Sequence, residues 1–205
     1  ISQDNFHLSP DILDKLLEEL KKSIDQNTIL VFAGRIPKGL SKGRVIGFLQ
    51  ELRKGACLLV VDSNSFSMEE LLRIRPWLIK PNEQEIESLI GERVNTLEQA
   101  KRAAAKIHDM GIDNVIVSMG KEGAVMASAE WSGGVRAPSI SPISTIGAGD
   151  SMIAGFIAGY VQGFNKKECL KNAVAFGTAA CLTEGTAPPS YEDVQRIRDK
   201  VVELE

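Results

Sequence analysis

The stretch Ser144-Thr145-Ile146-Gly147-Ala148-Gly149-Asp150-Ser151 joins a glycine turn to the start of an apolar segment. Gly147 and Gly149 have no Cβ, so the turn can adopt backbone angles closed to other residues and point successive N–H groups at one anion. The apolar run at 152–160 predicts a helix whose positive dipole end faces the same anion. Asp150, at the start of that helix, is either a helix cap or a general base.

Short apolar runs alternate with helical patterns from the beginning of the chain to about residue 118. This alternation is typical of an α/β fold with a mostly parallel sheet, in which ligands bind beyond the carboxyl ends of the strands. The predicted strands lie at 28–33, 57–61, 77–79 and 114–118. The predicted helices lie at 12–24, 45–52, 83–90 and 96–110, with a further short helix that includes residues 71–72. Residues 124–128 and 131–137 predict an antiparallel pair, and helices follow at about 148–162, 167–183 and 191–204.

The size and charge of the chain exclude several classes of protein. A chain of 205 residues can bury one substantial core, so we expect residues 1–205 to form a single α/β domain. The net charge of −3 shows no excess of positive charge of the kind that binds nucleic acid or an anionic membrane. No apolar run reaches the roughly 18 residues of a membrane span. The three widely spaced cysteines predict buried free thiols in a reducing compartment, the cytoplasm.

The stretch Lys80-Pro81-Asn82-Glu83-Gln84-Glu85 is a second candidate site. Pro81 ends the preceding strand, and Asn82 and Glu85 point the same way at the start of a helix. The two side chains can hold a hydrated Mg²⁺ through water beside a nucleotide phosphate. They can equally form a variant capping box, in which the Asn82 side chain caps the helix and the Glu85 side chain bonds back to the backbone N–H of Asn82. Both interpretations stay open at this point.

Two further segments have a structural and a functional interpretation. Residues 118–123, Ser-Met-Gly-Lys-Glu-Gly, form either a plain hairpin loop or one wall of a nucleotide site. The helix at 167–183 carries Asn172 among small residues, which favours close helix packing or a flat shelf for an adenine ring. The sequence contains no Walker A pattern, so a P-loop enzyme is excluded.

Three motifs in the same order resemble those of the PfkB/ribokinase family of sugar kinases. Residues 145–152 resemble its C-terminal glycine motif, residues 80–85 its Asn-x-x-Glu motif, and residues 31–39 its Ser-Gly-Ser-Leu-Pro-x-Gly loop. The resemblance implies a ribokinase-like three-layer α/β/α sandwich that uses ATP and Mg²⁺. It favours the branch that acts on sugar phosphates, with fructose 1-phosphate as the expected acceptor and tagatose 6-phosphate next.

The resemblance also implies roles for individual residues. Asp150 would be the catalytic base, and the N–H groups of Gly147, Ala148 and Gly149 would form the anion hole. Asn82 and Glu85 would organise Mg²⁺ through water, and Lys38 and Asp62 would lie in the polar wall near the sugar. The nucleotide would be bound by Asn82, Ser118, Gly120, Lys121, Glu122, Gly123, Gly149 and Asn172.

Members of this family are longer by about half again, and the part without a counterpart here is N-terminal. That part carries sugar contacts and a β-rich lid, so we expect an incomplete catalytic domain that is nearly inactive alone, and a homodimer for the full-length enzyme. Arg35 stands where the family usually has Ser. The alternatives are a kinase for an unphosphorylated sugar and a non-catalytic nucleotide-binding module.

Overall fold

The computed structural model describes residues 8–9, 11–55 and 57–204. Contacts between Cα atoms divide the chain into two compact units. The first unit comprises residues 1–79 and 110–113, and the second comprises residues 80–109 and 114–205.

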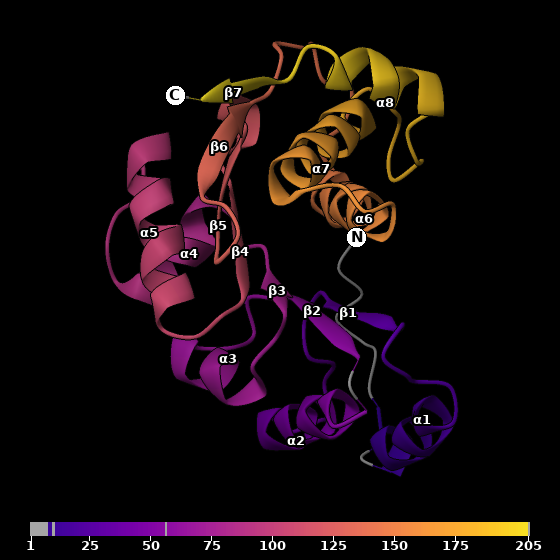
Figure 1. Ribbon diagram of the computed structural model, residues 1–205. Coiled ribbons are helices and arrows are strands. Elements are labelled where there is room, and N and C mark those ends of the chain that lie inside the picture. The colour runs from indigo at the N-terminus through magenta and orange to yellow at the C-terminus, as the bar shows by residue number, and fades with distance from the viewer. Residues whose placement is uncertain (1–7, 10, 56, 205) are drawn as a thin grey trace. The chain divides into compact units, whose positions relative to one another are not determined.

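The first unit contains three parallel strands in the order β1-β2-β3. Its elements are α1 (Asp11–Lys21), β1 (Ile29–Ala33), α2 (Lys42–Arg53), β2 (Leu58–Asp62), α3 (Met68–Ile74) and β3 (Leu78–Ile79). The sequence of β2 is a continuous apolar run with a buried centre, as expected for a strand inside a parallel sheet. The three helices lie on one side of these strands (Figure 1). The parallel strands predicted for this part are confirmed.

The second unit is built around antiparallel strands in the order β4-β5-β6-β7. Its strands are β4 (Asn114–Ser118), β5 (Ala124–Ser128), β6 (Gly133–Arg136) and β7 (Val202–Leu204). Its helices are α4 (Glu83–Ile90), α5 (Leu97–Asp109), α6 (Ala148–Val161), α7 (Lys166–Ala180), α8 (Tyr191–Arg198) and the 3₁₀ turn η1 (Gly120–Glu122). Helix α5 packs against β4 and β5 on one face, and α7 covers the other face, with α6 and α8 packed on α7 (Figure 1).

Helices α6 and α7 approach closely because small residues face each other. A Cβ built on Gly155 would lie 2.7 Å from the Cβ of Phe176 and 2.9 Å from the carbonyl oxygen of Asn172. A Cβ on Gly177 would lie 3.1 Å from the carbonyl oxygen of Ala148. The small residues of these helices therefore serve helix packing, the first of the two interpretations that the sequence left open.

The prediction of a helix over 191–204 is wrong at its end. Helix α8 stops at Arg198, and Val202–Leu204 forms β7, which pairs with Gly134–Arg136 of β6. Strand β6 would otherwise present an unpaired edge, and the β-branched pair Val201-Val202 favours an extended backbone. Tertiary pairing therefore overrides the helical pattern.

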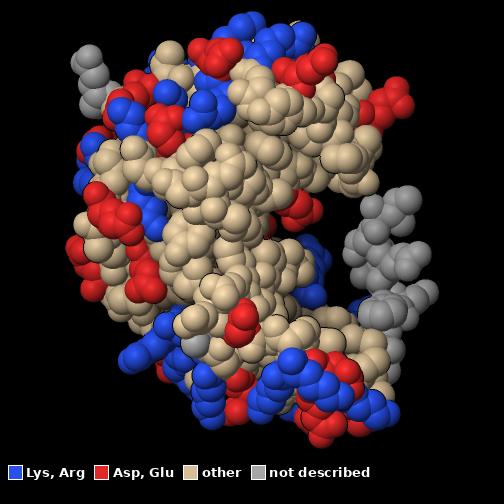
Figure 2. All heavy atoms as spheres, turned by 45° about the vertical axis from the view of Figure 1, so that its right-hand side comes forward, with Lys and Arg blue, Asp and Glu red and all other residues tan. Residues whose placement is uncertain are grey.

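Charged groups of both signs are interspersed on the face shown in Figure 2, so that face has no large field of one sign. Among the helices in the described ranges, none combines the length and the apolar character needed to cross a membrane.

We expect Gly123→Ala to destabilise the protein strongly. Gly123 has φ +111°, and a Cβ there would lie 2.0 Å from the carbonyl oxygen of Val135 in β6. Backbone strain and overlap together should lower the free energy of unfolding by about 3 kcal/mol, measured by urea titration. The control is Gly91→Ala, with φ +71° and open space around it, which should cost about 1 kcal/mol. Equal losses in the two variants would contradict this account.

Candidate active site

The glycine turn lies at the start of α6, and no side chain caps that helix. Gly147 is the N-cap residue, with φ 80° in the left-handed region, and Ala148, Gly149 and Asp150 form the first turn. Helices α2, α3, α4, α7 and α8 are instead capped by Ser41, Ser67, Asn82, Asn165 and Ser190. Of the N–H groups at this helix start, that of Ala148 makes a long hydrogen bond of 3.4 Å to the Thr145 carbonyl oxygen, and those of Gly147 and Gly149 are available to an anion.

Asp150 is the third residue of α6 and is exposed. Its side chain does not cap the helix, because the N-cap position belongs to Gly147. Within the described ranges, its carboxylate makes no hydrogen bond or ion pair. The cap interpretation of Asp150 is therefore not the one that the structure adopts, and the carboxylate is accessible to a ligand.

Lys80 brings a positive charge to the same helix end. Its side chain is 5% exposed, and a Cβ built on Gly149 would lie only 3.2 Å from its Nζ. Gly149 therefore leaves room for the ammonium group as well as freeing the backbone of the turn. A buried ammonium beside a helix N-terminus reinforces the preference of this point for an anion. The sequence interpretation gave Lys80 no role, although it lies in the same motif as Asn82.

Asn82 and Glu85 form the capping box that the sequence allowed. The side-chain oxygen of Asn82 accepts from the Glu85 N–H at 2.9 Å, and the Glu85 carboxylate accepts from the Asn82 N–H at 3.0 Å. These bonds leave lone pairs on both side chains, since a carboxylate has about four acceptor sites and an amide oxygen two. The pair fits a Mg²⁺ held through water but not a closed site of direct ligands. In the described part of the chain, no three His, Cys, Asp or Glu side chains cluster as metal ligands.

The end of β4 lies beside Asn82. Asn82 and Ser118 form a parallel β-bridge, and the Ser118 N–H donates to the carbonyl oxygen of Pro81 at 3.0 Å. After Ser118 the chain makes a tight turn through η1, closed by a 2.9 Å hydrogen bond from the Met119 N–H to the Gly123 carbonyl. Two candidate segments from distant parts of the sequence therefore meet at one edge of the second unit.

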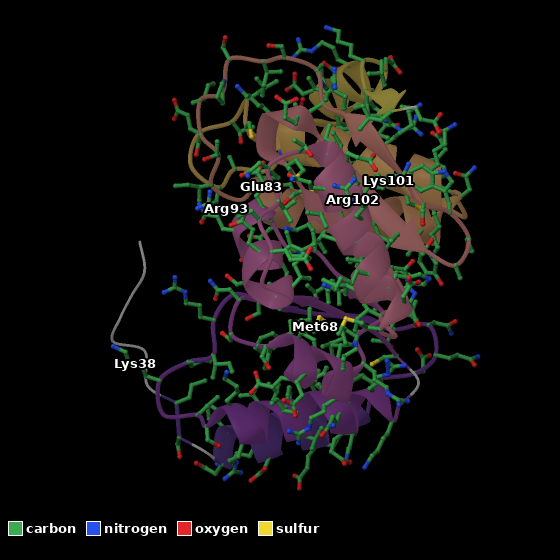
Figure 3. The ribbon with its side chains drawn as sticks, turned by 90° about the vertical axis from the view of Figure 1, so that its left-hand side faces the viewer. Lys38, Met68, Glu83, Arg93, Lys101 and Arg102 are labelled. Atoms are coloured by element: carbon green, nitrogen blue, oxygen red, sulfur yellow. The ribbon has the colours of Figure 1, made fainter. Side chains whose placement is uncertain are left out.

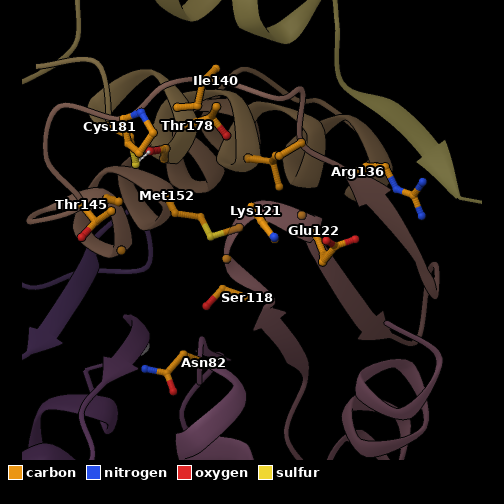
Figure 4. A pocket seen from close by; sticks show the side chains of 18 of the residues that line it. Asn82, Ser118, Lys121, Glu122, Arg136, Ile140, Thr145, Met152, Thr178 and Cys181 are labelled. Carbon is orange, nitrogen blue, oxygen red and sulfur yellow. Dashed lines mark hydrogen bonds between the residues drawn. The ribbon is translucent and has the colours of Figure 1, made fainter. Parts of the chain in front are cut away.

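A pocket of about 860 Å³ lies between these segments and helices α6 and α7 (Figure 4). This volume is within the range of small-molecule and cofactor sites. Its lining includes Asn82, Ser118, Thr145 and Gly149. The remaining walls come from the turn at 120–123, the segment at 136–142, and the α6 and α7 side chains Met152, Val174, Thr178 and Cys181.

Most of the predicted nucleotide residues line this pocket, and Asn172 does not. Asn172 is buried, and its side-chain N–H donates to the carbonyl oxygen of Gly155 at 2.6 Å. That bond satisfies a polar group between two closely packed helices, so the placement of Asn172 at the nucleotide is not what the structure shows. Lys38 and Asp62 belong to the first unit, Lys38 in the loop after β1 and Asp62 at the end of β2 (Figure 3).

The comparisons with known proteins agree with these motifs. Residues 5–193 match the model of the pfkB family carbohydrate kinases. The chain belongs to this family. It is 33% identical to 1-phosphofructokinase from Haemophilus influenzae over 199 residues, which cover 96% of this chain and 63% of that protein.

Two further relatives are phosphofructokinases from Escherichia coli. ATP-dependent 6-phosphofructokinase isozyme 2 is 31% identical over 183 residues, which cover 88% of this chain and 59% of that protein. The crystal structure of phosphofructokinase-2 in complex with potassium matches with a TM-score of 0.85 and 29% identity, over 95% of this chain and 63% of that chain. The ribokinase-like α/β fold is thereby confirmed, and the chain spans less than two thirds of the length of these relatives.

The three thiols are free, as the sequence predicted, but they differ in access. Cys57 and Cys169 are buried, whereas Cys181 is half-buried and lines the pocket. Burial raises the pKa of the Cys181 thiol. Its Sγ donates to the carbonyl oxygen of Gly177 at 3.4 Å.

We expect iodoacetamide to alkylate Cys181 before Cys57 and Cys169. The thiolate is the reactive form, and a raised pKa keeps it scarce at neutral pH, so the rate should rise about tenfold for each pH unit up to the pKa. Peptide mapping by mass spectrometry gives the rate at each thiol. The Cys181→Ser variant should lose the fast phase, and equal labelling of Cys169 and Cys181 would contradict the greater access of Cys181.

Proposed function

We propose that this chain forms the nucleotide-binding and base-bearing part of an ATP-dependent sugar-phosphate kinase. The proposed reaction converts fructose 1-phosphate to fructose 1,6-bisphosphate in the cytoplasm. The observation that carries the proposal is the uncapped glycine turn at the start of α6. It borders the pocket, with buried Lys80 on one side and the exposed carboxylate of Asp150 next to it.

The part of the pocket beside the start of α6 suits the phosphates of ATP. The N–H groups of Gly147, Ala148 and Gly149 and the ammonium of Lys80 stabilise negative charge at one point. Asn82 and Glu85 would hold Mg²⁺ through water at the neighbouring helix start. When bound, ATP supplies the γ-phosphoryl group and Mg²⁺ offsets the charge of its phosphates. The walls from 120–123 and from α7 would hold the nucleoside.

Asp150 is proposed as the base. Its carboxylate accepts the proton of the acceptor hydroxyl while that oxygen bonds to the γ-phosphorus. The bond from phosphorus to the bridging oxygen breaks, and ADP leaves with that electron pair. A carboxylate in the first turn of α6 is held by the helix beside the N–H groups that face the phosphoryl group, so base and anion site keep a constant spacing.

The names of the relatives and the resemblance of the motifs support a proposal for the acceptor. A relative named 1-phosphofructokinase favours fructose 1-phosphate, with Lys38 and Asp62 as proposed contacts near the sugar. A relative named 6-phosphofructokinase supports fructose 6-phosphate as the second candidate. Rates on fructose 1-phosphate, fructose 6-phosphate, tagatose 6-phosphate and ribose, measured side by side, distinguish the candidates. We also propose that residues 1–205 act as one domain and that the full-length enzyme is a homodimer.

The 205-residue chain alone should bind Mg-ATP and turn over fructose 1-phosphate very slowly. Much of the barrier reduction in phosphoryl transfer comes from positioning, and the chain spans only 63% of the relative named 1-phosphofructokinase. Calorimetry with ATP, with and without Mg²⁺, measures binding, and a coupled assay measures turnover. Normal turnover would refute the expected inactivity, and a folded chain that binds no ATP would favour a non-catalytic interaction module.

Asp150→Asn should abolish catalysis and spare nucleotide binding. In a full-length enzyme that carries this chain, we expect turnover to fall at least a hundredfold, the lower range for loss of a general base. The Kd for Mg-ATP should stay within about twofold, because the amide keeps the shape of the side chain. The matched control is Asp193→Asn on α8, a helix that does not line the pocket. If turnover of Asp150→Asn fell less than tenfold, Asp150 would not be the base.

A further inference from the structure

The turn after β4 has a fixed backbone at the edge of the pocket. The Met119 N–H donates to the Gly123 carbonyl oxygen at 2.9 Å, and the Glu122 N–H donates to the Met119 carbonyl oxygen at 3.0 Å. Gly123 packs directly on β6, where a Cβ would lie 2.0 Å from the carbonyl oxygen of Val135. The backbone that carries Lys121 therefore has a defined position, although the lysine side chain itself is exposed.

The two charged side chains of this turn point in different directions. Both Lys121 and Glu122 line the pocket, and successive residues of a 3₁₀ turn are separated by about a third of a turn. Figure 4 shows Lys121 among the pocket residues Met152 and Ser118, whereas Glu122 extends outward on the side of Arg136. Lys121 is thus the charged side chain that the turn directs into the pocket.

Lys121 differs in its contacts from other lysines of the second unit. In the described ranges of the chain, its ammonium group makes no ion pair or hydrogen bond with the protein. By contrast, the ammonium group of Lys106 on α5 lies 2.6 Å from the Glu92 carboxylate. An ammonium group at a pocket without a carboxylate partner suits an anionic ligand, to which it can donate charge-assisted hydrogen bonds.

We propose that Lys121 binds the phosphate chain of the nucleotide from a different wall than the start of α6. The glycine turn and Lys80 are taken to hold the transferred phosphoryl group. A cation on the turn at 120–123, which borders the nucleoside, then meets the phosphates nearer the nucleoside, and these remain in ADP. The inference rests on the proposed function, because the anion is taken to be a nucleotide.

The test compares Lys121→Gln with Lys121→Arg and with Lys101→Gln in the 205-residue chain. Lys101 is the matched control, because it lies on α5, does not line the pocket and makes no ion pair in the described part of the chain (Figure 3). Calorimetry at low and at high salt gives the Kd of each variant for Mg-ATP, Mg-ADP and adenosine. Thermal melting shows whether each variant is folded.

We expect Lys121→Gln to weaken Mg-ATP and Mg-ADP by about fivefold each at low salt, the effect of one exposed charge contact. Adenosine has no phosphate and should change less than twofold. The loss should shrink at high salt, because salt screens an exposed charge. Lys121→Arg keeps the charge and should bind as the unaltered chain does, and Lys101→Gln should change no ligand.

Three results would overturn the assignment of Lys121. The first is unchanged affinity for ATP and ADP in a folded Lys121→Gln variant. The second is an equal loss for adenosine, which would indicate a contact with the nucleoside or a structural role. The third is a loss for ATP alone, which would place the lysine at the transferred phosphoryl group.

The unaltered chain reports separately on the proposed function. If it binds adenosine but gains nothing from the phosphates, the proposed phosphate site is wrong, whatever the variants do. If it binds ATP more tightly than adenosine and Lys121→Gln does not change this preference, the phosphate site stands and only the role of Lys121 is refuted.

Discussion

The close packing of α6 on α7 is the constraint on which the candidate site depends. Gly155 and Gly177 let the two helices approach to distances at which a Cβ would meet backbone oxygen atoms of the neighbouring helix. A larger residue at either position would push α6 away and move its first turn with it. Because that turn carries the glycines and Asp150, the position of the proposed base depends on the packing of Gly177 against the first turn and of Gly155 about one turn further along α6.

The same packing brings opposite helix ends together. The end of α7 presents carbonyl groups, which hold the segment at 143–144, while the start of α6 presents N–H groups toward the pocket. The carbonyl groups at the end of α7, which would otherwise have no partner, therefore hold the segment that leads into the N–H groups at the start of α6. Lys80 adds its charge at this point, and its burial beside Gly149 explains why that position has no side chain.

The sequence predicted the elements well where a single pattern was decisive. The helix at 83–90 and the strands at 114–118 and 124–128 have the predicted limits, because each is a periodic run bounded by a turn residue. It could not show that Val202–Leu204 pairs with β6, since that depends on an edge created by the fold. The sequence could not indicate a role for Lys80 at the glycine turn, because that role depends on how close its ammonium group lies to Gly149 in the fold. The hydrogen bond of Asn172 to the Gly155 carbonyl could not be predicted either, because its partner lies on another helix.

The starts of α4 and α6 differ in capping: side chains cap α4, and no side chain caps α6. Asn82 and Glu85 satisfy the N–H groups at the start of α4, which makes that side of the pocket rigid before any ligand arrives. Gly147 leaves the start of α6 without a side-chain cap, so the N–H groups of Gly147 and Gly149 can donate to an anion, while that of Ala148 makes a long bond of 3.4 Å to the Thr145 carbonyl oxygen. Capping at Asn82 and a role in holding Mg²⁺ through water are therefore compatible, because the cap fixes the direction of the remaining lone pairs. Rigidity on one side and unsatisfied donors on the other are what a phosphoryl-transfer site requires, since its catalysis is mainly positioning and electrostatic stabilisation.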